Sequence, residues 1–224
     1  MEPDVAVVIP VVNCLTYTRQ AVGSIYPRGR LYLIDNGSTD GTQAWAESRA
    51  DDHFVYLRQE RNLGVAASWN LGLRRAFDDG YGLVLVANND VVFAPDTLPA
   101  LRAWAVETEG FITVHAVPSL GFLERLPREH RLDQPLDFCA FLINPVIVGR
   151  VGWFDEAYWP AYFEDCDYQK RMEQAGVRMG RAMDAVACHY WSRTIREGGV
   201  KNAPYFEQNQ RRFMTKWGHL QGRT

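Results

Sequence analysis

A cluster of oxygen-bearing side chains follows the apolar segment 82–87, namely Asn88, Asn89 and Asp90. A carboxylate beside amide oxygens suits Mg²⁺ or Mn²⁺, because these ions prefer oxygen ligands and also keep waters and substrate phosphates. His189, at the end of a later apolar segment, could complete such a site. Asn and Asp are equally common in turns, and a lone His is often structural, so the residues alone leave an ordinary polar strand end as the alternative.

Two adjacent carboxylates, Glu164 and Asp165, open a predicted helix over residues 164–175. A carboxylate near a helix N-terminus stays ionised, which is the state that a general base needs. Aromatic residues such as Trp159 precede the pair, so we expect the carboxylates to lie against aromatic surface. The alternative is simple complementation of the helix dipole, which contributes about 0.3–1 kcal/mol for each exposed charge.

A further carboxylate, Asp35, ends the apolar segment 30–35 and precedes Asn36, Gly37 and Ser38. A carboxylate at the end of a buried strand needs a partner. It could accept a hydrogen bond from the imide N–H of uracil or thymine. A strand-to-helix turn explains the Asn, Gly and Ser equally well, so the segment alone leaves both readings open.

The elements that must position these residues alternate between strand and helix patterns. We expect strands over residues 5–12, 30–35, 53–57, 82–87 and 111–117, with helices over residues 15–25, 42–48, 64–77 and 95–107. This order predicts an α/β fold with a mostly parallel sheet flanked by helices. Ligands of such sheets bind outside the carboxyl ends of the strands, where Asn13, Asp35 and Asp90 all fall.

The second half of the chain has a different character. Residues 118–135 are rich in proline and charge without a clear period, and we expect them to form a mobile loop over the site. Later elements are expected as strands over residues 138–143 and 186–190, and helices over residues 145–150, 164–175 and 205–217.

Composition excludes several classes of protein. The chain has 224 residues, of which 47% are hydrophobic, and a net charge of −3, which is typical of a globular protein without a basic nucleic-acid coat. Apolar runs stay far below the roughly 20 residues of a membrane helix, and the four cysteines form no CxxC pair. The sequence lacks GxGxxG, GxxxxGK[ST], HExxH and GxSxG. We therefore expect a cytoplasmic protein without stable membrane insertion, with peripheral attachment at the inner membrane face as an alternative.

Taken in order, the motifs resemble the family 2 glycosyltransferases of the GT-A fold, including rhamnosyltransferase-like members. The matching stretches are VVIPVVNCLTYTRQAVGSI, LYLIDNGSTDGT, RNLGVAASWNLGL, VANNDVVF, GWFDEAYWPAYFEDCDYQKRMEQAG and the His of ACHYW. The resemblance implies a minimal single catalytic domain over residues 1–224. Its donor-binding half would be residues 1–117, and its acceptor-binding half residues 118–224.

The resemblance also implies a role for each matching residue. Donor binding falls to Pro10, Val12, Asn13, Asp35, Asn62, Asn70, Asn88 and Asn89. Asp90 and His189 match the metal ligands, and an Asn at position 88 stands where the family's DxD element has its first acid. Asp165 matches the general base and Glu164 is a second choice. Trp153, Asp155 and Trp159 match the acceptor side.

The implied activity is transfer of a sugar from a nucleoside-diphosphate sugar to a hydroxyl acceptor, with inversion and with Mn²⁺ or Mg²⁺ as cofactor. Asp35 favours a UDP- or dTDP-linked donor over a purine nucleotide. The acceptor would be a glycan, a glycolipid or a modified nucleic acid base, and the seven Arg or Lys against two Glu in residues 193–224 could hold an anionic one. The alternative is a non-catalytic nucleotide-sugar or carbohydrate binding protein on the same fold, since the NND element weakens the metal motif. A nucleotidyltransferase would need a basic, Gly-rich loop after the first strand, which is absent.

Overall fold

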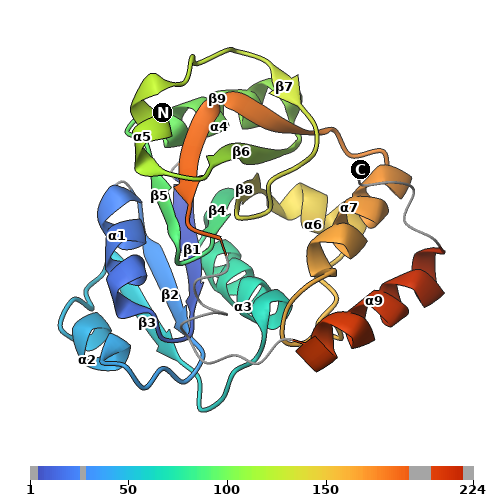
Figure 1. The fold of residues 1–224 in the computed structure, drawn as a ribbon. Helices are drawn as coiled ribbons and strands as arrows, with labels where there is room; N and C mark the ends of the chain where they lie inside the picture. Colours follow the sequence, from blue (N-terminus) through green and yellow to red (C-terminus); the bar gives the residue numbers. More distant parts are fainter. Residues whose placement is uncertain (1–4, 26–28, 192–202, 219–224) are drawn as a thin grey trace.

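The computed structural model describes residues 5–25, 29–191 and 203–218 (Figure 1). Its centre is one nine-stranded sheet in the order β3-β2-β1-β4-β8-β6-β9-β5, with β7 paired to β9. The strands are β1 (Val5–Val11), β2 (Leu31–Asp35), β3 (Phe54–Arg58), β4 (Leu83–Ala87), β5 (Val91–Phe93), β6 (Phe111–Val117), β7 (Leu132–Asp133), β8 (Ala140–Ile143) and β9 (Met179–His189).

Most strands of the sheet run in one direction. β1 is parallel to β2 and β4, and β2 is parallel to β3. β8 is antiparallel to both β4 and β6, so β6 runs the same way as β4, and β9 runs parallel to β6. β5 and β7 are antiparallel to β9. The predicted α/β fold with a mostly parallel sheet is confirmed, and the carboxyl ends of β1, β2, β4, β6 and β9 share one edge.

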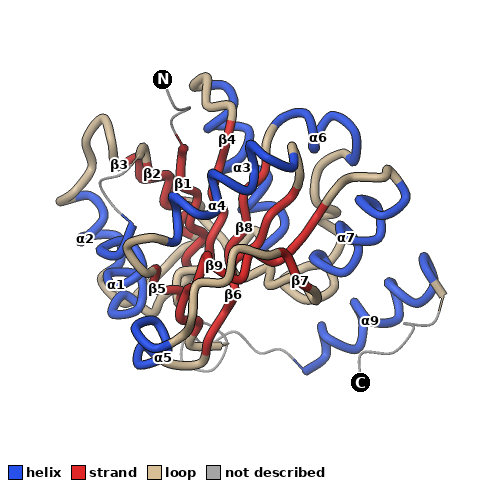
Figure 2. The backbone as a smooth tube through the Cα atoms, turned by 90° about the horizontal axis from the view of Figure 1, so that it is seen from above, coloured by secondary structure: helices blue, strands red, loops and turns tan. Residues whose placement is uncertain are grey.

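Helices cover both faces of this sheet (Figure 2). One face packs against α1 (Leu15–Ile25), α2 (Thr42–Glu47) and α4 (Thr97–Thr108), and the other against α3 (Val65–Asp78), α6 (Pro145–Val151) and α7 (Glu164–Gln174). Alternate residues of β1 enter the two cores, because successive side chains of a strand point to opposite faces. All seven residues of β1 are buried, which explains its unbroken apolar sequence.

Helix α3 approaches β1 closely at Gly72. A Cβ atom added to Gly72 would lie 2.2 Å from Cγ1 of Val8. A glycine in the middle of a helix costs about 1 kcal/mol relative to alanine, so close packing is its structural reason here. This contact fixes the helix whose N-terminal end lies beside the site described below.

The last described helix, α9 (Ala203–Trp217), begins two residues before its predicted start. It lies next to α7 in both views of the backbone (Figures 1 and 2). Phe213 of α9 is buried in a small apolar cluster with Tyr158 and Phe163, which belong to the segment before α7. The end of the chain therefore packs against the residues that lead into the predicted carboxylate pair.

Residues 118–135 contain regular structure that the sequence prediction missed. They include α5 (Leu120–Arg125) and the short strand β7, which pairs with β9. Arg128 stabilises this segment by donating to the Leu123 carbonyl at 2.7 Å and to Asp96 at 2.9 Å. The prediction of a mobile loop over the site was therefore wrong for α5 and β7, where side-chain hydrogen bonds and strand pairing take the place of the missing apolar period.

Strand β9 is much longer than the predicted 186–190, and β5 was not predicted. Arg181 and Asp184 interrupt the apolar pattern of β9, yet both have partners. Asp184 accepts a hydrogen bond from the Trp104 indole at 2.8 Å, and Arg181 donates to the Gln134 carbonyl at 3.2 Å. Polar residues that are satisfied by neighbouring elements can thus continue a strand where the pattern indicates its end.

Candidate functional site

A pocket of about 410 Å³ opens at the carboxyl edge of the sheet. It receives residues from the ends of β1, β2, β4 and β9, from the start of β8, and from the segment leading into α7. Of the residues predicted from the sequence, the following line it: Pro10, Val12, Asn62, Asn88, Asn89, Asp90, Glu164, Asp165 and His189. Residues separated by more than 100 positions therefore meet in one concave site.

Asp90 and His189 are brought together by strand pairing. Val91, the first residue of β5, lies opposite His189 in the antiparallel ladder, and the Asp90 carbonyl accepts the Tyr190 amide at 3.0 Å. The Nε2 atom of His189 lies 3.2 Å from Oδ1 of Asp90. Asp90 is buried, and the neighbouring Asn89 donates to the Thr18 hydroxyl at 3.0 Å.

These side chains can supply part of a divalent-metal site. A carboxylate and an imidazole suit Mn²⁺, and oxygen ligands from Asn88 or Asn89 stand beside them. Within the described ranges, no group of three or more His, Cys, Asp or Glu side chains could hold an ion. The protein would therefore provide Asp90 and His189, with waters and substrate phosphates as the remaining ligands.

Glu164 and Asp165 differ sharply in environment although they are neighbours at the start of α7. Glu164 is buried, and its Oε2 atom has no hydrogen-bond partner. Burial, and secondly the charge of Asp165, raise the pKa of the Glu164 carboxyl well above its usual range. Asp165 is half-buried, and its Oδ1 atom accepts a hydrogen bond from the backbone amide of the next residue, Cys166, at 2.7 Å. The pair thus offers one buried carboxyl whose ionised form is disfavoured and one carboxylate side chain that accepts a hydrogen bond at the helix N-terminus.

This difference predicts the pH dependence of stability for Glu164→Gln. The folded protein keeps the Glu164 proton to higher pH than the unfolded chain, whose carboxyl pKa is about 4.3. The wild type therefore loses stability as pH rises from about 4.3 through the raised folded pKa, whereas glutamine cannot ionise. We expect the variant to have the higher melting temperature at pH 8 and no such advantage at pH 4. Thermal melts across this range test it, and a difference that is constant with pH would contradict it.

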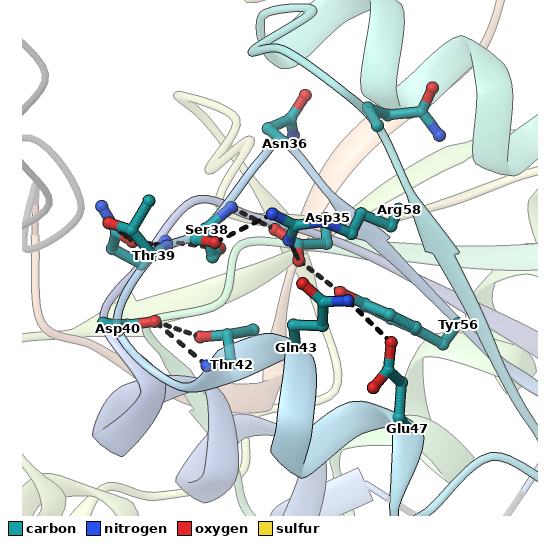
Figure 3. Close-up of polar contacts among 12 residues, drawn as sticks. Asp35, Asn36, Ser38, Thr39, Asp40, Thr42, Gln43, Glu47, Tyr56 and Arg58 are labelled. Carbon is teal, nitrogen blue, oxygen red and sulfur yellow. Dashed lines mark hydrogen bonds and ion pairs between the residues drawn. The ribbon is translucent and has the colours of Figure 1, made fainter.

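Asp35 does not line the pocket, contrary to expectation. It is fully buried, and both oxygens are used (Figure 3). Oδ1 accepts the Ser38 amide at 2.8 Å, while Oδ2 accepts from the Tyr56 hydroxyl and from Arg58 at 2.6 Å. Burial and the Asp35 hydrogen bond raise the pKa of Tyr56 to about 12. In this structure Asp35 is therefore bonded to its own neighbours in the sheet, and its contact with a base stays a prediction.

The neighbour of Asp35 takes the place at the pocket. Asn36 lines it, and its Oδ1 atom accepts from the Leu63 amide and the Ser68 hydroxyl, both at 3.0 Å. Asn13 also lies outside the lining, because its Oδ1 atom accepts the Thr39 amide at 2.7 Å and so joins two loops. The sequence placed these two loops at the right edge of the sheet, but Asn36 lines the pocket where Asp35 and Asn13 were expected to.

Three further predicted residues serve the scaffold instead of the pocket lining. Asn70 is buried, where its amide accepts the Phe154 N–H at 3.0 Å and donates to the Phe154 carbonyl at 2.9 Å. Trp153 packs against Phe77, with the Arg74 guanidinium 4.5 Å from its ring centre. Asp155 forms an ion pair with Lys216 at 3.3 Å. In this structure Asn70, Trp153 and Asp155 therefore contact other parts of the protein, and their ligand contacts stay predictions.

Trp159 stands at the border of the pocket without lining it. Its indole donates to the Asn62 carbonyl at 3.2 Å, and a Cβ atom added to Gly64 would lie 2.8 Å from its Cδ1 atom. Gly64 has a φ of +87°, so both conformation and close contact favour glycine there. About 40% of Trp159 remains exposed. Its ring can therefore meet a ligand that extends out of the pocket.

Several lining residues escaped the sequence analysis. They are chiefly Asn36, Asp137, Cys139 and Trp191. Asp137 precedes β8 and accepts the Ala116 amide at 3.0 Å, so its place depends on the antiparallel strand pairing that the sequence did not predict. Trp191 lies two positions after the predicted metal ligand His189, and this short spacing could have indicated that Trp191 also lies at the pocket.

Comparison with known proteins identifies the family. The sequence model described as Glycosyl transferase family 2 matches residues 6–154, well over half of the chain. The chain belongs to this family. Its α/β architecture is accordingly that of the GT-A glycosyltransferases, and the predicted family and fold are confirmed.

Two curated proteins and a solved structure are similar to this family 2 glycosyltransferase. A galactofuranosyl glycosyltransferase of Leishmania donovani is 26% identical over 215 residues, covering 71% of this chain and 50% of that protein. An N-acetylglucosaminyl-diphospho-decaprenol L-rhamnosyltransferase of Mycobacterium tuberculosis is 30% identical over 188 residues, covering 64% and 61%. The chain thus spans about half to three fifths of the length of these relatives.

The structure is a mannosyltransferase of Pyrobaculum calidifontis in complex with GDP-Man and Mn²⁺. It superposes with a TM-score of 0.62 at 19% identity, covering 94% of this chain and 69% of that one. At this identity the likeness concerns the fold. No helix within the described ranges has the length and apolar character needed to cross a membrane.

Proposed function

We propose that this family 2 glycosyltransferase moves a sugar from a nucleoside-diphosphate sugar to a hydroxyl acceptor with inversion at the anomeric carbon. The proposal rests on one observation above all: Asp90, His189 and Asp165, which are far apart in sequence, line a single pocket at the carboxyl edge of the sheet. Residues 1–117 supply the proposed donor side, and residues 118–224 supply most of the acceptor side.

Asp90 and His189 would hold Mn²⁺ or Mg²⁺ in this proposal. The bound ion would neutralise the charge that grows on the leaving diphosphate. Burial of Asp90 and its 3.2 Å approach to His189 support the assignment, and Asn88 and Asn89 would add polar contacts to the donor. Pro10, Val12 and Asn62 would form the wall against which the nucleotide packs.

Asp165 is the proposed general base. An acceptor hydroxyl has a pKa far above 7, so its proton must leave as the oxygen attacks the anomeric carbon and the bond to the diphosphate breaks. Glu164 is less suited to this role, because burial raises the pKa of its carboxyl and so disfavours the ionised form that a general base needs. Attack from the side opposite the leaving group in a single displacement would invert the anomeric centre.

The acceptor remains a proposed class: a glycan, a glycolipid or a modified nucleic acid base. The mycobacterial relative is named for transfer of L-rhamnose to N-acetylglucosaminyl-diphospho-decaprenol, which is a lipid-linked sugar. The half-exposed ring of Trp159 supports stacking on an acceptor sugar. Arg211, Arg212 and Lys216 lie on α9, whereas the other basic residues of 193–224 lie outside the described residues.

A cytoplasmic location is part of the proposal. The four cysteines, all of them among the described residues, are free thiols, which is usual for proteins of a reducing compartment.

A donor screen tests the proposal. Purified protein is melted with UDP-, dTDP- and GDP-linked sugars, each with and without Mn²⁺. We expect one donor to raise the melting temperature only with Mn²⁺, because a ligand at 100 times its Kd stabilises the folded state by about 2.7 kcal/mol. The predicted preference for a pyrimidine nucleotide rests on Asp35, which is bonded to Tyr56 and Arg58 in this structure, so the screen compares all three nucleotides directly.

The same screen also measures slow hydrolysis of each donor. The released nucleoside diphosphate is the quantity that is detected. Hydrolysis with Mn²⁺ supports the transferase. Binding without hydrolysis or transfer supports the alternative, a nucleotide-sugar binding protein, which Asn88 in place of an acid favours. Absence of binding by every donor, with and without Mn²⁺, would overturn both.

A further inference from the structure

Helix α9 holds the segment that forms one wall of the pocket. Asn209 of α9 is fully buried, and its Nδ2 atom donates to two backbone carbonyls, that of Trp159 at 3.2 Å and that of Ala161 at 2.9 Å. Its Oδ1 atom is buried without a hydrogen-bond partner. A buried polar side chain is costly unless its hydrogen bonds are made, so this one is committed to the 159–161 backbone.

The backbone carbonyl of Pro160, between those of Trp159 and Ala161, accepts a hydrogen bond from a different helix. Pro160 accepts the Val65 amide at 2.8 Å, and Val65 is the first residue of α3. Three consecutive carbonyls are thus fixed by two helices, Trp159 and Ala161 by α9 and Pro160 by α3. Pro160 and Ala161 line the pocket and Asp165 follows four residues after Ala161, so these hydrogen bonds fix the backbone that leads to Asp165.

A second contact ties the far end of α9 to α7. Asp167 is fully buried and accepts from Arg171 at 2.8 Å, from the Trp217 indole at 2.8 Å and from Lys216 at 2.8 Å. Burial alone would raise the pKa of Asp167, but hydrogen bonds from Lys216, Trp217 and Arg171 lower it below the usual value. This contact fixes the helix, while Asn209 fixes the wall.

We propose that Asn209 is a positioning residue: from the C-terminal helix it sets the backbone of residues 159–161 and, through it, the place of Asp165. The inference rests on the proposed function. A positioning role differs from a purely structural one in its kinetics. Misplacing a catalytic group by about 1 Å can cost on the order of 100-fold in rate without changing donor binding.

The test compares Asn209→Ala with Gln210→Ala, an exposed neighbour on the same helix. We expect Asn209→Ala to lower kcat for transfer at least tenfold at a temperature well below its melting point, with the Kd for donor and Mn²⁺ within twofold of wild type. Gln210→Ala should match wild type. An unchanged kcat, or an equal loss of kcat and donor affinity, would overturn the proposal.

A stability-matched variant separates positioning from helix docking. Phe213→Ala removes buried apolar packing of α9 and leaves the Asn209 hydrogen bonds in place. At a matched distance below each melting point, it should retain clearly more of its kcat than Asn209→Ala. An equal loss in both would mean that Asn209 acts only by docking α9.

Amide hydrogen exchange keeps the inference distinct from the proposed function. Asn209→Ala should speed exchange at residues 161–166, and Gln210→Ala should not, whether or not the protein transfers a sugar. If wild type neither binds nor turns over any donor, the proposed function fails while this readout still tests the positioning of the wall. Unchanged exchange in Asn209→Ala would refute the positioning itself.

Discussion

Asp165→Asn should lower kcat for sugar transfer by about 10²–10⁴-fold, the usual contribution of a general base. The amide keeps the shape of the side chain and can still accept the Cys166 amide, but it cannot take a proton from the acceptor. Donor binding in the presence of Mn²⁺ should survive, because the metal ligands are proposed to be Asp90 and His189. Transfer kinetics and donor calorimetry on the same preparation measure the two effects.

Glu173→Gln is the matched control for this prediction. Glu173 lies exposed on the same helix and pairs with Lys170 at 2.9 Å, so its loss removes a charge of equal sign outside the pocket. It should leave kcat within twofold of wild type. Transfer by Asp165→Asn at the wild-type rate would remove the base assignment and return Glu164 to consideration.

Asp90→Ala should abolish the dependence on Mn²⁺ together with tight donor binding. Loss of supporting residues around metal ligands commonly costs 10–100-fold in metal affinity, so loss of the one carboxylate ligand should cost about 100-fold or more. The thermal shift by donor plus Mn²⁺ should vanish. Titrations of Mn²⁺ against both melting temperature and activity measure this.

The control for Asp90 is Asp96→Ala, which removes a carboxylate that pairs with Arg128 away from the main pocket. It should keep the Mn²⁺ response. The melting temperature of Asp90→Ala without ligand is measured first, and a value close to that of the wild type shows that the variant is folded. Wild-type activity that persists unchanged in a chelator would instead eliminate the metal from the mechanism.

The fold was predictable because its signals are local. Buried parallel strands such as β1 have continuous apolar sequences, and α1 matched its predicted bounds, 15–25, without correction. Asp90 and His189 meet at one edge of the sheet because each follows or ends a strand there, whereas the place of Asp165, at the start of α7, was implied by the family resemblance.

The sequence says less about where side chains point and which distant elements meet. Asp35 was placed on the right loop, but Tyr56 and Arg58 on the adjacent strand donate hydrogen bonds to it, and no local pattern indicates that pairing. Trp153 packs on α3 because the chain turns there at Gly152, whose φ is +87°. Asn209 belongs to no recognisable sequence motif, since its partners are backbone carbonyls 50 and 48 positions earlier in the chain.

The position of β9 in the sheet constrains the order in which the strands can pair during synthesis of the chain. β9 inserts between β6 and β5, both of which precede it in the chain, and it ends at His189. A nascent chain that has reached residue 178 has β5 and β6 without the strand that joins them, and unpaired strand edges favour aggregation. The proposed metal ligands therefore come together late in synthesis, when the ribosome has delivered the strand that closes the gap.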